Sequence, residues 1–252
     1  MPAPIALQLY TLRQELARDF GGTVERVAAL GYLGVETAGF PGTTPQAASQ
    51  RFKDLGLTVC AAHAPLPLGD RQAEVLDTME ALGCRRLVCA WQPQELFQSA
   101  ASIQRVCETL NEAEAVARAH GLSLGYHNHW WEFLPVDGSL AHHRLRDGLA
   151  PTVFFEIDTY WAKAAGVDPA AILRELGPRA PLLHLKDGPA VQGQPMLALG
   201  EGVMDIPGVL EASAGHAEWL IVELDECATD MFAAVQRSYQ YLAAKGLGRG
   251  KN

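Results

Sequence analysis

Carboxylate and imidazole side chains follow three apolar segments in the second half of the chain, and together they could bind a cation. The segments TVFFEID, PLLHLKD and WLIVELD contain Asp158, His184 and Glu223 at or near their ends. Burying such groups singly costs free energy, so their repetition directly after apolar runs requires a compensating positive charge. Taken one at a time, Asp158 could cap a helix, His184 could be a core histidine and Glu223 could pair with Lys186.

The donor atoms of these side chains also indicate which ion would bind. Carboxylate oxygens with one or two imidazole nitrogens suit Mn²⁺, Co²⁺, Mg²⁺ or Zn²⁺, whereas a thiolate zinc site would need cysteines. The five cysteines are widely spaced and contain no CxxC, so we expect them to be free thiols in a reducing compartment. We therefore expect one divalent ion as the cofactor, with Mn²⁺ favoured.

A weak internal repeat predicts the elements that position these groups. Seven helix-like stretches end in glycine and run into a short apolar segment, and the glycines stand at positions 31, 56, 83, 121, 148, 177 and 215. Glycine is typical of a left-handed helix C-cap, and short apolar runs are typical of strands buried on both faces. With the N-terminal segment IALQLYTL as a first strand, the pattern predicts an α/β protein, a single (β/α)₈ TIM barrel spanning residues 1–252.

In such a barrel the site lies where the C-terminal ends of the strands converge. Aromatic rings stack on sugar or cyclitol rings, although they could also pack loops. The residues that we expect to contact a substrate from these strand ends and the loops after them are Gln8, Tyr10, Glu36, His63, Trp91, Trp131 and Trp161.

The order of the motifs HNHWWEF, EIDTYW, HLKDG and VELDE resembles the sugar phosphate isomerase/epimerase family of the xylose isomerase-like superfamily. The resemblance covers nearly the whole chain. It implies a divalent metal held by a Glu after strand five, an Asp after strand six, a His after strand seven and a Glu after strand eight. The last three carry over as Asp158, His184 and Glu223.

The fifth strand departs from this pattern, because His127 stands where many members have their glutamate, and Glu132 follows five residues later. Either Glu132 folds back onto the metal, or His127 is the ligand and Glu132 contacts substrate. We favour Glu132, so the predicted ligands are Glu132, Asp158, His184 and Glu223. The sequence Tyr-His-x-His is closer to the inosose dehydratase and 3-keto-sugar branch than to epimerases with paired glutamates.

The function that this implies is isomerisation or epimerisation of a keto-sugar or inositol derivative by proton abstraction next to a carbonyl. The same start leads to a dehydratase or lyase if a β-oxygen leaves instead. The residues expected to move protons are His127, His129, Glu223 and Lys186. Few cations lie near the motifs, which favours an unphosphorylated substrate.

Composition limits the other classes of function. Hydrophobic residues make up 48% of the 252 residues, and Lys+Arg 20 against Asp+Glu 29 gives a net charge of −9. An acidic chain is a poor nucleic-acid binder, which argues against a nuclease of the endonuclease IV type. A sugar-binding barrel without catalysis is a second rival. We find no signal peptide or membrane segment and expect a cytoplasmic protein, possibly a homo-oligomer, without nucleic-acid or membrane partners.

Overall fold

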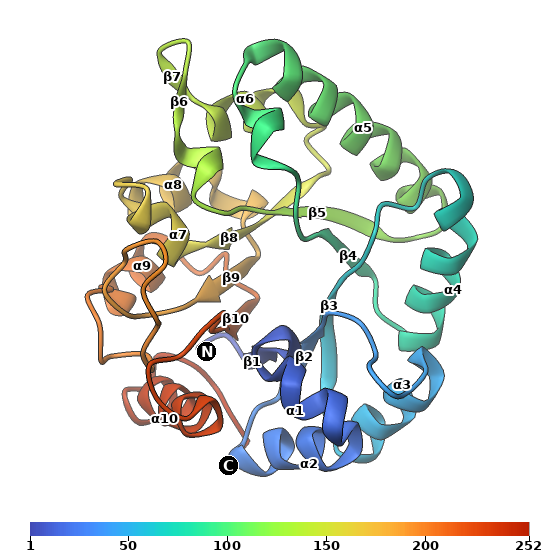
Figure 1. Ribbon diagram of the computed structural model, residues 1–252, viewed down its shortest axis with the longest axis vertical. Helices are drawn as coiled ribbons and strands as arrows, with labels where there is room; N and C mark the ends of the chain where they lie inside the picture. The colour runs from blue at the N-terminus through green and yellow to red at the C-terminus, as the bar shows by residue number, and fades with distance from the viewer. Residues whose placement is uncertain (252) are drawn as a thin grey trace.

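Eight parallel strands close into a barrel in the computed structural model, which describes residues 1–251 (Figure 1). Neighbours around the barrel follow the order β1-β10-β9-β8-β5-β4-β3-β2. The barrel strands are β1 (Ile5–Gln8), β2 (Gly34–Thr37), β3 (Thr58–His63), β4 (Arg86–Cys89), β5 (Ser123–His127), β8 (Phe154–Asp158), β9 (Leu182–Leu185) and β10 (Trp219–Val222). This architecture confirms the predicted TIM barrel.

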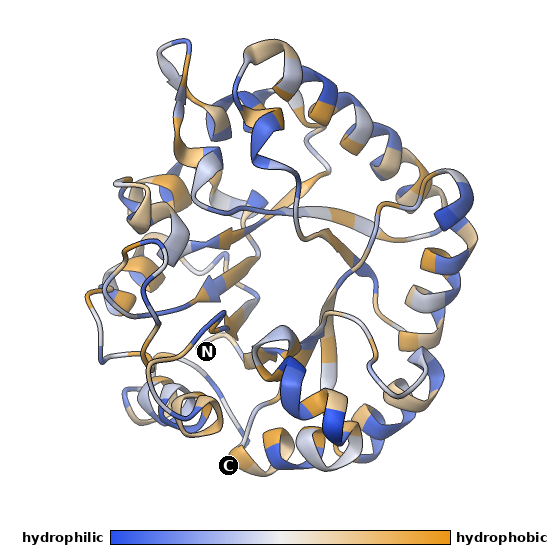
Figure 2. Ribbon diagram, in the orientation of Figure 1, coloured by the Kyte–Doolittle hydropathy of each residue, from blue (hydrophilic) through white to orange (hydrophobic). Residues whose placement is uncertain are grey.

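The helices surround the barrel and alternate hydrophobic with hydrophilic residues, whereas the strands are mostly hydrophobic (Figure 2). Among residues 1–251, no helix combines the length and apolar character needed to cross a membrane. The α-helices are α1 (Arg13–Arg18), α2 (Phe20–Leu30), α3 (Pro45–Asp54), α4 (Gln72–Leu82), α5 (Ala100–Ala119), α6 (Ala141–Gly148), α7 (Thr159–Ala164), α8 (Pro169–Leu176), α9 (Ile206–Ala212) and α10 (Met231–Ala244).

Smaller elements occupy the connections. The 3₁₀ helices are η1 (Leu9–Leu12), η2 (Gly69–Arg71), η3 (Gln94–Phe97), η4 (Trp131–Phe133) and η5 (Gly177–Arg179). After η4 a two-stranded hairpin, β6 (Pro135–Val136) and β7 (Ser139–Leu140), projects from the barrel (Figure 1). The repeat predicted eight helices, and the structure adds the short helices α1 and α7 ahead of α2 and α8, because Asp19 and the segment around Gly166 interrupt the helical backbone.

The repeated glycines mostly end helices as expected. Gly31 and Gly83 adopt φ values of 108° and 63° at the C-caps of α2 and α4, a conformation that other residues rarely take. Gly148 is different: it is the last residue of α6 and does not have positive φ. A Cβ at Gly148 would lie 2.7 Å from Cys107 Sγ, so this glycine allows α6 to pack closely on α5.

The barrel interior is built in layers, because every second residue of a strand points inward. The lower layer is apolar and consists of Ala6, Cys60, Ala61, Val88, Phe154, Leu182 and Ile221, all buried. Gly125 on β5 leaves room for the Phe154 ring, since a Cβ there would lie 2.2 Å from it. Two residues further along β1, β3, β8, β9 and β10, the inward positions become polar, and they carry Gln8, His63, Glu156, His184 and Glu223 of the site described below.

A buried histidine outside the barrel gives a prediction about stability. His142 on α6 is 1% exposed, its ring lies near those of Phe133 and Phe155, and within residues 1–251 neither ring nitrogen has a hydrogen-bond partner. Burial, with His143 and nearby arginines, lowers the pKa of His142 to about 3.

As pH falls, the unfolded chain protonates His142 first, because the folded state holds the ring neutral down to a pKa of about 3. The folded protein therefore has its full stability above the unfolded pKa of about 6.5 and loses stability as pH falls from there toward the folded pKa. We expect this one group to cost about 2 kcal/mol of unfolding free energy between about pH 6.5 and about pH 5. Urea unfolding of His142→Phe should show a shallower acid dependence than the parent. The same replacement at the exposed His120 is the control, and parallel curves for parent and His142→Phe would contradict the prediction.

Candidate active site

The polar residues of the barrel lie directly above the apolar lower layer, at the C-terminal ends of the strands. On β8 the inward series is Phe154, Glu156 and Asp158, and on β9 it continues from Leu182 to His184, which pairs with Asp158. All of these side chains are buried. Carboxylates and imidazoles at this depth need partners, and the partners come from neighbouring strands.

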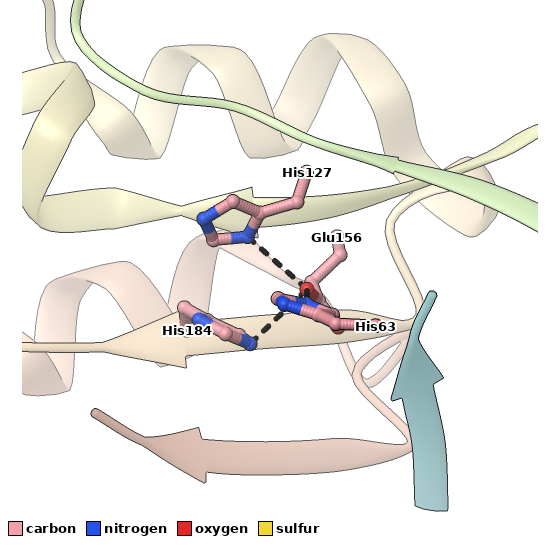
Figure 3. A group of neighbouring side chains, drawn as sticks. All are labelled: His63, His127, Glu156 and His184. Carbon is pink, nitrogen blue, oxygen red and sulfur yellow. Dashed lines mark hydrogen bonds and ion pairs between the residues drawn. The ribbon is translucent and has the colours of Figure 1, made fainter. Parts of the chain in front are cut away.

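The first group, which we call the deep cluster, consists of Glu36, His63, His127, Glu156 and His184. Glu156 is its centre (Figure 3): its Oε2 lies 2.6 Å from His63 Nε2, 3.1 Å from His127 Nδ1 and 3.1 Å from His184 Nε2. Burial acts to raise the pKa of Glu156, but His184 and His63 outweigh it and lower the pKa well below its usual range. Glu156 is therefore an ionised carboxylate facing three rings.

Glu36 is the second carboxylate of the deep cluster. Its Oε2 accepts a hydrogen bond from Gln8 Nε2 at 2.7 Å and lies 2.6 Å from His184 Nε2. Burial, with the charge of Glu156, raises the pKa of Glu36 to about 7. Glu36 thus holds the inner nitrogen of His184 while carrying a proton part of the time near neutral pH.

The second group, which we call the outer cluster, consists of His127, Asp158, His184 and Glu223. One donor atom of each lies within 4.8 Å of the others, and all four residues are buried. His184 takes part in both clusters through different nitrogens: its Nδ1 lies 2.7 Å from Glu223 Oε2, while its Nε2 faces Glu36 and Glu156.

Lys186 lies beside the outer cluster and is almost fully buried. Its Nζ lies 3.0 Å from Asp158 Oδ2, 2.9 Å from Glu223 Oε2 and 2.7 Å from Asp225 Oδ2. Burial acts to lower the pKa of Lys186, but these three carboxylates outweigh it and raise the pKa well above its usual value. Lys186 is therefore a permanently charged ammonium.

The outer cluster fits a divalent cation better than the deep cluster. It supplies two carboxylates and two imidazoles, whose donor atoms lie within 4.8 Å of one another. A metal-bound histidine usually donates its other ring N–H to a carboxylate, which is the relation of His184 Nε2 to Glu36. The metal-competent donors of the deep cluster, by contrast, are three imidazoles and only one carboxylate, from His63, His127, His184 and Glu156.

The expected metal ligands are brought together with one change. Asp158, His184 and Glu223 converge, but Glu132 lies outside both clusters. Its Oε1 accepts from Tyr126 Oη at 2.7 Å and its Oε2 from the His129 backbone N–H at 2.9 Å. Both carboxylate oxygens thus hold the turn after β5. The geometry does not support our preference for Glu132 and favours the stated alternative, His127.

A cavity of about 580 Å³ opens above the clusters and is lined by all four expected proton carriers. His127, His129, Lys186 and Glu223 line it, as do Tyr10, His63 and Trp91 from the expected substrate contacts. A wider open depression of about 950 Å³ lies over α4 and residues 120–122, away from the strand ends.

Four expected substrate contacts do not line this cavity. Gln8 and Glu36 lie beneath it, where they bind each other. Trp131 stacks on His129 with ring centroids 4.3 Å apart, and the Trp161 ring centroid lies 5.5 Å from Lys186 Nζ, so both reach the site only through another residue.

Glu156 was not among the predicted site residues. Its signal was present in the motif EID: if Asp158 points into the barrel, then so does the residue two positions before it.

The two buried carboxylates of the deep cluster should respond differently to replacement by glutamine. Glu156→Gln removes a full negative charge that supports three imidazoles, so we expect metal affinity and turnover to fall by about 10–100-fold. Glu36→Gln should cost less, because the amide resembles the protonated form that Glu36 already samples near neutral pH. Metal titration and turnover of both variants test this, and equal losses would contradict the assignment of the charge to Glu156.

Comparison with known proteins identifies a matching family model. The model described as the xylose isomerase-like TIM barrel matches residues 24–243. No curated protein matches the chain.

Several solved structures share the fold across nearly the whole chain. A sugar phosphate isomerase/epimerase from Parabacteroides distasonis ATCC 8503 superposes with a TM-score of 0.83 at 24% identity, covering 99% of this chain and 96% of that one. The probable 3-DHS dehydratase AsbF of petrobactin synthesis from Bacillus anthracis gives 0.75 at 14% identity, covering 96% and 99%. The IOLI protein with a binding zinc atom gives 0.68 at 13% identity, covering 96% and 98%. At these identities the likeness concerns the fold.

Proposed function

The chain belongs to the xylose isomerase-like TIM barrel family, and from this premise we propose that it is a divalent-metal-dependent isomerase or epimerase. Its substrate is an unphosphorylated keto-sugar or inositol derivative, and the reaction begins with removal of a proton next to a carbonyl. The proposal is supported by structural neighbours described as a sugar phosphate isomerase/epimerase and as the IOLI protein with a binding zinc atom.

The observation that carries the proposal is the outer cluster at the base of an open cavity. His127, Asp158, His184 and Glu223 would hold the ion, with Mn²⁺ favoured by their oxygen and nitrogen donors. When bound there, the ion supplies Lewis acidity toward a substrate carbonyl and stabilises the negative charge that develops on its oxygen.

The side chains that line the site differ in whether they can accept a proton. Burial lowers the pKa of His127 to about 4 and that of His129 well below its usual value, so both rings are neutral near pH 7. A neutral His127 can bind the ion, whereas His129, which is not one of the four ligands, can accept a proton. Burial acts to raise the pKa of Glu223, but Lys186 and His184 lower it well below its usual range, so Glu223 is an ionised second candidate for the base. The three N–H groups of the Lys186 ammonium face Asp158, Glu223 and Asp225 and favour the ionised form of these carboxylates.

The absence of a phosphate site supports the unphosphorylated substrate. Lys186 is the one lysine or arginine among the residues that line the cavity, and three carboxylates already surround it. A phosphate would need a second cation or a nest of backbone N–H groups.

A dehydratase or lyase is the second candidate, and the position of His127 favours it. An epimerase that works with paired glutamates would need a second glutamate in the outer cluster, where this chain has an imidazole. With His127 on the ion, His129 can take up the substrate proton as an imidazolium and pass it to a departing oxygen, which completes an elimination. The probable dehydratase among the structural neighbours is in keeping with this route.

Chelation tests the proposal. Purified protein treated with EDTA should lose conversion of ketoses and inososes and recover it when Mn²⁺ is added back. Conversion that survives complete removal of metal would contradict the metal-dependent mechanism, whereas metal binding without any conversion would favour the sugar-binding alternative.

A further inference from the structure

The cavity above the clusters differs in chemistry between its two halves. The strand ends of β5, β8, β9 and β10 contribute His127, His129, Lys186, Glu223 and Asp225, together with Asp158 beneath them. The strand ends of β1 to β4 contribute one imidazole, that of His63, which faces Glu156. The other groups are mainly apolar, and we call them the apolar arc: Tyr10, Ala38, Pro65, Leu66, Ala90 and Trp91. Because these four strands are consecutive around the barrel, the apolar arc is one continuous side of the cavity.

Two large aromatic rings of the apolar arc face solvent. Trp91 is 55% exposed and Tyr10 is 44% exposed, so neither ring serves mainly to fill the core. Tyr10 is nevertheless held in place: Arg13 Cζ lies 4.3 Å from the centre of its ring, and Arg13 Nη2 donates to the Asp225 backbone oxygen at 2.8 Å. Exposed and positioned aromatic rings next to a polar site are typical of ligand contacts.

The apolar arc offers few hydrogen bonds to a ligand. Gln92 lies beside Trp91 in the cavity lining, and its Nε2 already donates to Cys89 Sγ at 3.4 Å. A second sugar ring could stack on Trp91 but would find few polar partners for its several hydroxyl groups on this side, and the apolar arc contains no lysine or arginine for a phosphate. A flat apolar group would instead exclude water from Trp91, Leu66 and Pro65.

We propose that the apolar arc is a subsite for a planar apolar substituent, such as an aryl group attached to the sugar or cyclitol ring. This inference rests on the proposed function, since it places the polar ring of the substrate at the outer cluster. It adds that the natural substrate is an aryl-substituted sugar or cyclitol, such as a glycoside with an aromatic aglycone, rather than a free monosaccharide.

Binding of simple glycosides to the Mn²⁺-loaded protein tests this inference without turnover, because these probes lack a ketone. Calorimetric titration should give phenyl β-D-glucopyranoside a Kd at least tenfold lower than methyl β-D-glucopyranoside, with cellobiose close to the methyl compound. Trp91→Ala should remove most of the difference between the phenyl and methyl compounds, while Trp91→Phe should retain much of it. Val191→Ala, an exposed apolar residue outside the cavity, is the control.

Three results would overturn the subsite: equal Kd values for the phenyl and methyl compounds, tighter binding of cellobiose, or no binding of the phenyl glycoside at millimolar concentration. The proposed function is tested by a separate measurement, exchange of the hydrogen next to the carbonyl of keto-sugars, and the absence of this exchange would contradict it. Retained exchange with equal Kd values overturns only the subsite, and a retained phenyl preference without exchange overturns only the reaction.

Discussion

Asp158→Ala should yield a folded barrel that no longer retains a stoichiometric divalent ion, with turnover reduced by at least about 1000-fold. Asp158 is fully buried, and its carboxylate is one of the four donors of the outer cluster. Removing it takes one carboxylate from the outer cluster and also one of the three partners of Lys186. Elemental analysis of the purified variant, together with its turnover, gives the measurement.

A matched control separates the metal role of Asp158 from its structural role. Asp158 Oδ1 also caps α7 by accepting from the Trp161 backbone N–H at 2.9 Å. Asp168 caps α8 in the same way, accepting from the Ala170 N–H at 3.0 Å, but lies on the surface. Asp168→Ala should therefore lose some stability and keep both metal and activity. Full metal content in Asp158→Ala would contradict the ligand assignment.

His129→Gln should reduce turnover by about 100-fold or more while the protein keeps its metal. His129 lines the cavity but is not one of the four residues of the outer cluster, so its loss removes a proton acceptor without removing a ligand. Its Nδ1 is buried and has no hydrogen-bond partner within residues 1–251. Steady-state turnover and metal content of the same preparation are the measurements.

His127→Gln provides the contrast, because His127 belongs to the outer cluster and should lose metal as well as turnover. His216→Gln, in the loop before β10 at the opposite end of the barrel, should change neither. If His127→Gln and His129→Gln both keep near-parental turnover and bind metal normally, the histidines after β5 are structural. Glu223 would then have to carry the proton.

The sequence alone predicted the barrel because its signals are local and repeated. Glycines after helical stretches and short apolar runs recur through the chain, and Asp158, His184 and Glu223 lie directly at or after the ends of such runs. Once strands are parallel and the barrel is closed, their C-terminal ends must meet, so residues far apart in the sequence become one site.

The placement of Glu132 could not be predicted in this way. It lies in η4, whose turn follows β5, and its direction depends on hydrogen bonds to Tyr126 and to the His129 backbone. Loop conformations of this kind are set by specific partners rather than by periodicity. The sequence showed only that Glu132 follows His127 by five residues, which is close enough to make it a candidate metal ligand.

The deep cluster could in principle be predicted from the alternation of side chains along each strand. Residues two positions before the metal ligands point to the same side of their strands, which gives Glu156 from Asp158 and the apolar Leu182 from His184. Sequence inspection does not distinguish a carboxylate that binds a metal from one that supports a histidine, because the distinction lies in which nitrogen each carboxylate faces.

Hydrogen exchange at carbon tests the central claim most directly. Ketoses and inososes are incubated in D₂O with the Mn²⁺-loaded protein and followed by NMR and mass spectrometry. We predict that at least one substrate either gains deuterium at the carbon next to its carbonyl or is consumed by elimination, and that EDTA stops both. Neither outcome across a broad panel, with metal shown to be bound, would contradict proton abstraction as the function of this site.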